Sequence, residues 1–197
     1  MTTASAPTER IATGPADASM RLEAWGDSDR GRNPDRPRNE DWQYFPRQND
    51  DRVEDESRRQ RGDLFIVCDC MGGRDAGQEA SDIAGNMIRR QFYYMQPDGL
   101  SVEEMLANSL REANREVFRL SSQQGSKLFG MGTTAAVAVV KYGFLYVANV
   151  GDSRVYLVPG SGRPQQISRD HTWVREALDA GRITAECFEL IKENIRP

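Results

Sequence analysis

The sequence predicts an α+β protein, in which strands and helices occupy separate stretches of the chain. A short apolar run at residues 64 to 69 has the length of a buried strand. Apolar residues then recur at helical spacing over residues 76 to 95 and 102 to 122. Two further apolar runs, 133 to 140 and 144 to 150, flank a tight turn and are typical of hairpin strands. We therefore expect antiparallel sheets covered by helix pairs.

The first third of the chain is expected to add little to the core. Residues 1 to 19 are rich in Ala, Thr, Ser and Pro without periodicity, which indicates a disordered tail and places the domain at residues 20 to 197. Apolar and polar residues alternate over 20 to 25, which predicts an edge strand, and a second short strand is expected at 42 to 45. Residues 47 to 63 mix both charge signs and have almost nothing to bury, so we expect an exposed loop there.

The later elements follow from local signals. Ser101 and Glu104 form the pattern of a capping box, which predicts where the helix over residues 102 to 122 begins. After the hairpin, a third strand is expected at 154 to 158, and a short extended segment follows the next turn. The pattern becomes helical again from Trp173.

Composition excludes several classes of partner. The 197 residues suit one domain, and a net charge of −4 gives no general argument for binding nucleic acid, so we expect no such partner. The longest apolar run, 135 to 140, is too short to cross a bilayer. Three cysteines without framework spacing indicate a reducing compartment, so we expect a cytoplasmic protein. The oligomeric state stays open.

Acidic residues stand at three junctions between strands and loops. Glu40 and Asp41 precede a predicted strand, Asp69 ends one, and Asp152 lies between two. Side chains at such junctions can converge on one edge of a sheet, and carboxylate oxygens are the ligands that Mg²⁺ and Mn²⁺ prefer. The alternative for each aspartate is that it only caps a turn.

Five segments in this order resemble the motifs of a known family. They are RPRNED at 36–41, VCDCMGGRDAGQEAS at 67–81, GMGTTAAVAVV at 130–140, ANVGDSRVYLV at 148–158 and ISRDHTWV at 167–174. Together they resemble the metal-dependent protein phosphatases, the PPM or type 2C serine/threonine phosphatases in their bacterial style. The resemblance covers about residues 20 to 180.

This resemblance implies a fold and an activity. The fold would be a partial sandwich of two antiparallel β-sheets flanked by antiparallel helix pairs. The family holds two Mg²⁺ or Mn²⁺ ions, and metal-activated water attacks the phosphate of a phosphoserine or phosphothreonine protein substrate. A pair of cations suits this chemistry because it activates water and neutralises phosphate charge.

The resemblance also assigns the metal ligands. Asp69 would bridge both metals, and Glu40 would bind one of them. Asp41 would be a ligand or a partner of one, and the backbone carbonyl of Cys70 would be another ligand. Asp152 would belong to a third, weaker metal site.

The substrate phosphate would be held by Arg36 in the same way. A guanidinium group matches phosphate oxygens as a bidentate donor, which is why arginine suits this role. The loop between Gly31 and Asn39 is longer than is usual in the family, so Arg32 or Arg38 could serve instead.

Cys70 departs from the family pattern, which has glycine at this position. A thiolate is a soft ligand that favours Zn²⁺ or Fe over Mg²⁺, so one interpretation is a site with shifted metal preference. The other interpretation is a cysteine that the site merely tolerates. Thr133 and Thr134 are expected to pack and hydrogen-bond, not to act as nucleophiles.

The C-terminal segment departs from the pattern as well. The resemblance implies that the family continues with two aspartates that complete one metal site. Glu186, Glu189 and Glu193 are expected to lie on the solvent-exposed face of a helix and not to replace them. We therefore expect a C-terminally incomplete phosphatase domain with weak or no activity. The alternative is a catalytically dead pseudophosphatase that binds a phosphoprotein or a kinase.

Overall fold

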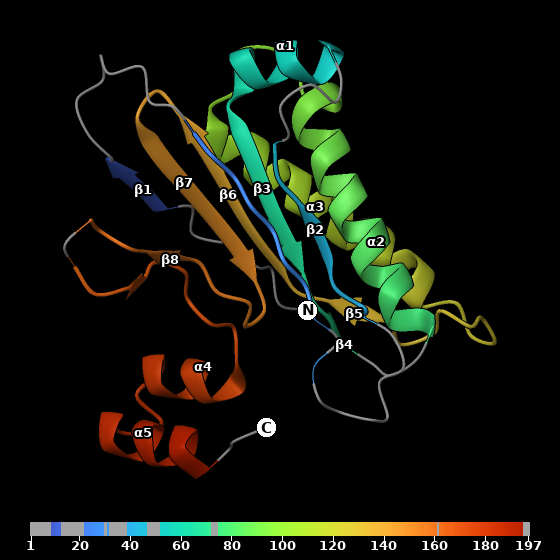
Figure 1. Cartoon of the computed structure of the whole chain (residues 1–197). Helices are drawn as coiled ribbons and strands as arrows, with labels where there is room; N and C mark the ends of the chain where they lie inside the picture. The colour runs from blue at the N-terminus through green and yellow to red at the C-terminus, as the bar shows by residue number, and fades with distance from the viewer. Residues whose placement is uncertain are drawn as a thin grey trace.

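A computed structural model describes residues 9–12, 22–29, 31, 39–46, 52–71, 75–160 and 162–194 (Figure 1). Its strands are β1 (Glu9–Ala12), β2 (Trp42–Tyr44), β3 (Asp63–Cys68), β4 (Cys70–Met71), β5 (Gly132–Thr133), β6 (Ala135–Lys141), β7 (Phe144–Val150), β8 (Tyr156–Leu157) and β9 (Gln165–Gln166). Its helices are α1 (Arg52–Arg61), α2 (Asp75–Arg90), the π-helical turn η1 (Gln91–Met95), α3 (Val102–Ser121), α4 (Trp173–Asp179) and α5 (Ala185–Asn194). Across these described ranges, no helix is long and apolar enough to span a membrane.

The described strands form one large antiparallel sheet and two short ribbons. The large sheet has five strands in the order β1-β7-β6-β3-β2, and β4 pairs with β5 while β8 pairs with β9. Helices α2 and α3 lie side by side over one face of the sheet, and α4 and α5 lie beyond the end of the sheet where β7 finishes (Figure 1). The mixture of helices and antiparallel sheets confirms the predicted α+β class.

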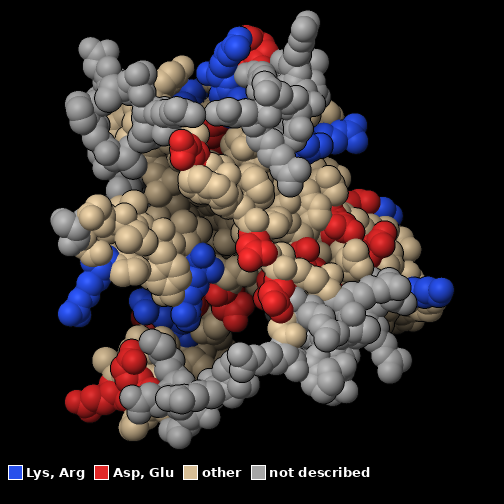
Figure 2. All heavy atoms as spheres, viewed as in Figure 1, with Lys and Arg blue, Asp and Glu red and all other residues tan. Residues whose placement is uncertain are grey.

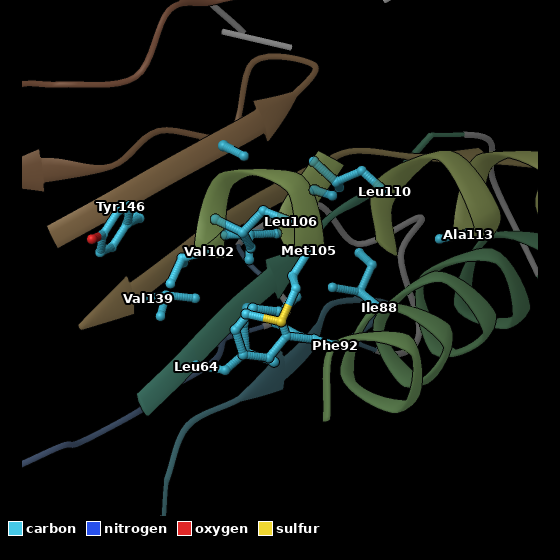
Figure 3. Close-up of a cluster of buried hydrophobic side chains, with 14 of the residues drawn as sticks. Leu64, Ile88, Phe92, Val102, Met105, Leu106, Leu110, Ala113, Val139 and Tyr146 are labelled. Atoms are coloured by element: carbon cyan, nitrogen blue, oxygen red, sulfur yellow. The ribbon is translucent and has the colours of Figure 1, made fainter. Parts of the chain in front are cut away.

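The core lies between the large sheet and the helix pair. Alternate residues of β3, Leu64, Ile66 and Cys68, are buried on the helix-facing side, as a strand with one covered face requires. Figure 3 shows Leu64, Phe92 and Met105 directed toward one another in this layer. Phe92 is fully buried, so the π-helical turn also contributes to the core.

A glycine brings α2 close to the edge strand β2. A Cβ atom on Gly85 would lie only 2.0 Å from Cε3 of Trp42, so the indole ring packs directly on the backbone of α2. Trp42 follows Glu40 by two residues. The contact therefore fixes the acidic segment before β2 against the helix.

Local signals placed α3 and the hairpin correctly. The Ser101 hydroxyl accepts the N–H of Glu104 at 3.2 Å, and the Glu104 carboxylate accepts the N–H of Ser101 at 2.8 Å, so the predicted capping box is confirmed. Tyr142 and Gly143 have φ of 51° and 75° in the turn between β6 and β7, where the hairpin was expected. Of the strand predicted at residues 154 to 158, only β8 forms.

The loop predicted over residues 47 to 63 is wrong where α1 forms. Arg61, whose side chain is 13% exposed, donates to the carbonyls of Phe92 at 3.3 Å and Gln96 at 3.0 Å. Arg58 donates to the carboxylate of Asp63 at 2.8 Å. Arg61 thus joins the helix to residues more than 30 positions away, and a search for apolar periodicity does not detect such polar contacts.

The N-terminal expectations also need correction. Residues 9–12, predicted to belong to a disordered tail, form β1 and pair with β7, while the other residues of 1 to 19 lie outside the described ranges. The edge strand predicted over 20 to 25 is absent from its described part, 22 to 25. Leu22 and Ala24 are half-buried while Glu23 and Trp25 are exposed, so the alternation is kept although no strand forms there. The domain limits 20 to 197 remain a prediction.

Candidate functional site

Asp69 lies where β3 gives way to β4, and its backbone is fixed on both sides by the start of β6. Its N–H donates to Oγ1 of Thr134 at 3.1 Å, and its carbonyl accepts the N–H of Thr134 at 2.8 Å. The hydroxyl of Thr133 donates to the same carbonyl at 2.9 Å. These bonds confirm the predicted hydrogen-bonding role of both threonines, and they hold Asp69 at the strand exit with its side chain exposed.

The loop that carries Asp152 meets Asp69 through the same threonine. Oγ1 of Thr134 lies 2.6 Å from Oγ of Ser153, within hydrogen-bond distance. Gly151 has φ of 93°, and a Cβ atom there would lie 2.7 Å from Cγ2 of Thr134, so only glycine allows this approach. The structure thus brings the segments of Asp69 and Asp152 to one end of the sheet, and Asp152 is exposed.

A second set of contacts holds the Asp152 loop from the other side. Nδ2 of Asn149 donates to the carbonyl of Arg169 at 2.7 Å, and the N–H of His171 donates to the carbonyl of Gly151 at 2.9 Å. Nε of Arg154 donates to both carboxylate oxygens of Asp170, at 2.9 and 3.1 Å, and these bonds raise the pKa of Arg154. The loop is therefore a fixed part of the site.

Glu40 is held between α2 and β4. The hydroxyl of Ser81, a residue that is 1% exposed, donates to the carbonyl of Glu40 at 2.7 Å. The thiol of Cys70 donates to Oε2 of Glu40 at 3.0 Å. The N–H of Asp41 donates to Oδ1 of Asn39 at 3.1 Å, and the Asp41 side chain is exposed. Ser81 was not predicted to take part, and its place in the motif that begins at Val67 is the one signal that could have found it.

The two cysteines near Asp69 differ in their surroundings. Cys68 faces the core and is fully buried, and burial raises the pKa of its thiol to about 12, so it stays protonated at neutral pH. Cys70 is 6% exposed, pairs with Thr133 across the β4–β5 ribbon, and directs its thiol to Glu40. Only Cys70 of these two contacts a predicted metal ligand in the described structure.

The predicted phosphate-binding arginine, Arg36, lies outside the described residues, as do its alternatives Arg32 and Arg38. These assignments stay predictions. Figure 2 shows several acidic side chains near the middle of the face in view.

The described residues fit a hard cation in the chemistry of their donors. Carboxylate and carbonyl oxygens are the ligands that Mg²⁺ and Mn²⁺ prefer. In the part of the chain that the structure describes, however, no three Asp, Glu, His or Cys side chains gather closely enough to hold an ion. Glu40 and Asp69 therefore stay predicted ligands.

An α+β fold with acidic residues at its strand exits offers carboxylate oxygens to divalent cations. The family model of protein phosphatase 2C matches residues 43–195. The chain therefore belongs to the protein phosphatase 2C family. The comparison confirms the family that the five sequence segments resemble.

The curated relatives are bacterial phosphatases. The chain is 34% identical over 125 residues to the serine/threonine phosphatase stp of Listeria monocytogenes serotype 4b (strain F2365), a match covering 62% of this chain and 49% of that protein. It is 33% identical over 124 residues to the protein phosphatase PhpP of Streptococcus pneumoniae, with the same coverage of 62% and 49%. The chain thus spans about half the length of the curated relatives it matches.

Solved structures of the same family share the fold. The serine/threonine phosphatase PstP/Ppp of Mycobacterium tuberculosis superposes with a TM-score of 0.60 at 27% identity, covering 91% of this chain and 61% of that chain. The catalytic domain of PstP in complex with two manganese ions gives a TM-score of 0.59 at 28% identity, covering 91% and 63%. Stp1 of Staphylococcus aureus gives 0.62 at 25% identity, covering 92% and 60%.

Proposed function

We propose that this chain forms part of a Mg²⁺- or Mn²⁺-dependent protein phosphatase that acts on phosphoserine and phosphothreonine in proteins. The observation that carries the proposal is the pair of contacts made by the Thr134 hydroxyl, which holds the segments of Asp69 and Asp152 at one end of the sheet. The relatives named as serine/threonine phosphatases support the reaction class, and the PstP structure with two manganese ions supports the cofactor.

The residues that would hold the metals are Glu40, Asp69 and the backbone carbonyl of Cys70, with Asp41 and Asp152 as further ligands. The cations, when bound, would activate water and neutralise the charge of the phosphate. The protein's own contribution is to fix the donors. Asp69 is held through its backbone, and Glu40 is held by contacts from Ser81 and Cys70. Such supporting contacts keep ligands in place before a metal arrives.

The substrate is proposed by its chemical class. Arg36 is proposed to bind the phosphate, because a guanidinium donates two parallel hydrogen bonds to phosphate oxygens. The substrate would be a phosphoprotein in the cytoplasm, a compartment that suits a chain whose three cysteines form no disulfide in the described structure. The comparisons do not favour the alternative of a pseudophosphatase, since the matched relatives are described as phosphatases.

The test is hydrolysis of p-nitrophenyl phosphate and a phosphothreonine peptide by the purified chain, with and without Mn²⁺. Because the described residues form only part of a ligand set, we expect weak hydrolysis that requires Mn²⁺ and disappears in Asp69→Ala. Glu186→Ala, which removes an exposed carboxylate from α5, is the matched control and should leave the rate unchanged.

Two results would contradict the proposal. Hydrolysis that persists in Asp69→Ala would place the activity elsewhere. Binding of the phosphopeptide by the folded chain without any turnover, measured by calorimetry in the presence of Mn²⁺, would support the pseudophosphatase instead.

A further inference from the structure

A small cavity lies between the helix pair α2 and α3 and the strands of the large sheet. Its volume is about 50 Å³, and it opens partly to solvent. Ile88 and Leu110 line it from the two helices. Ala135 and Val150 line it from β6 and β7. Figure 3 shows Ile88, Leu110 and Ala113 at the same side of the hydrophobic cluster. The cavity is therefore a gap in the layer that forms the core.

Three alanines leave this space. Ala84, Ala113 and Ala135 line the cavity and are 4%, 3% and 5% exposed. Protein interiors contain few voids larger than a water molecule, because the atoms that line a void lose packing contacts. Each alanine side chain ends at its Cβ atom, so the space that a larger apolar side chain could occupy stays accessible to a molecule from solvent.

The lining suits an apolar group better than water. A buried water molecule needs about 10 to 15 Å³ and two to four polar partners. Asn114 and Thr133 are the two polar side chains among the described lining residues. The Thr133 hydroxyl already donates to the carbonyls of Asp69 and Thr134, at 2.9 and 3.0 Å, and Asn114 is exposed on the surface of α3. An apolar group that displaces water from this cavity therefore breaks few hydrogen bonds.

The volume sets the size of that group. A cavity of roughly 150 Å³ accommodates the six carbon atoms of benzene. This cavity has about a third of that volume, so by the same proportion it holds about two to three carbon atoms, the size of an isopropyl group. The described lining residues include no charged side chain, so the group that enters must be neutral.

We propose that this cavity binds the branched end of a small, neutral aliphatic molecule, whose polar head stays at the open side that Asn114 borders. Burial of two to three carbon groups gives only weak binding, with a dissociation constant of roughly 10 mM. The inference is independent of the proposed function, because none of the lining residues is a predicted metal ligand or phosphate-binding residue.

The experiment is a titration of the purified chain with isobutanol, followed by the methyl signals in ¹H–¹³C NMR spectra. We expect saturable shifts confined to methyl groups that line the cavity, among them those of Ile88, Leu110 and Val150. Cyclohexanol, whose ring is too large for the cavity, should give no saturable shift at these methyl groups. Shifts that grow linearly and spread over the whole spectrum would reflect a general effect of the alcohol and would contradict the proposal.

Two variants that fill the cavity complete the test. Ala113→Leu should weaken isobutanol binding at least about tenfold, because the added carbon atoms occupy the space. Val117→Phe fills it from a half-buried position and decides the result if Ala113→Leu does not fold, which circular dichroism shows. Ala180→Leu adds the same atoms at an exposed position outside the lining and should bind like wild type. Unchanged binding in a folded variant with the cavity filled would overturn the proposal.

Discussion

The hydroxyl of Thr134 lies 2.6 Å from the hydroxyl of Ser153 and also accepts the backbone N–H of Asp69. One buried side chain, 1% exposed, thus joins the strand exit that carries Asp69 to the loop that carries Asp152. A threonine can do this because its hydroxyl donates one hydrogen bond and accepts two.

Thr134→Val tests this joint, since valine keeps the shape and removes the hydroxyl. The N–H of Asp69 and the Ser153 hydroxyl would both lose a partner, so we expect the free energy of unfolding to fall by about 1 to 3 kcal/mol. Urea unfolding followed by circular dichroism measures the change. Thr134→Ser keeps the hydroxyl and should recover most of the lost stability. Equal stability of Thr134→Val and the wild-type protein would show that the hydrogen bonds of Thr134 do not stabilise the fold.

Gly85→Ala tests the contact between α2 and Trp42. The added Cβ would lie 2.0 Å from the indole ring, so either the helix or Trp42 must move. Overpacking of this kind costs about 1 to 3 kcal/mol, which outweighs the gain in helix propensity from alanine. A thermal melt should show a lower Tm for Gly85→Ala. Gly160→Ala, where a Cβ would meet nothing within 4 Å, should melt like wild type.

Arg61→Ala should loosen α1. The substitution leaves the carbonyls of Phe92 and Gln96 without the guanidinium that now bonds them. We expect a loss of about 1 to 3 kcal/mol in stability and faster amide hydrogen exchange across α1 and η1. Arg59→Ala removes a guanidinium whose side chain is 78% exposed and is the control. Unchanged exchange in Arg61→Ala would mean that α1 is held in another way.

Thiol labelling should separate the three cysteines. The thiolate is the reactive form, and burial both blocks Cys68 and raises its pKa to about 12, while Cys70 is 6% exposed. In native, metal-free protein we expect a disulfide reagent to label Cys187 first, with Cys68 and Cys70 reacting only on unfolding. Cys187→Ser should therefore lose the fast phase of thiol labelling. A fast phase that survives in this variant would show that the end of the sheet at β3 and β4 opens readily.

Much of the fold could be predicted because its signals are local. Ser101 and Glu104 lie one helical turn apart, and their capping box marks the start of α3 without reference to the rest of the chain. The helix α1 was not predicted, because the contacts that hold it are not local. Its stabilising partners, Phe92 and Gln96, are distant in sequence, and its bonds to them are polar.

The candidate site likewise combines features that local signals predict with features that depend on contacts between distant segments. The positions of Asp69 and Asp152 at strand ends could be predicted from the apolar runs around them. The contact of Thr134 with Ser153 and the hydrogen bond from Ser81 to Glu40 link separate segments of the chain. A single sequence does not reveal such side-chain contacts. The contact of Cys70 with Glu40 belongs to the same kind.

The pairing of β1 has a consequence for the order in which the chain acquires its structure. Glu9 pairs with Val147, so β1 must wait until β7, far along the sequence, has been synthesised before its partner exists. The neighbouring helices α2 and α3, by contrast, pack on each other across a short connection. Closing a long loop is slow compared with forming local contacts. We therefore expect the hairpin of α2 and α3 to nucleate folding, and β1 to be among the last strands to pair with the sheet.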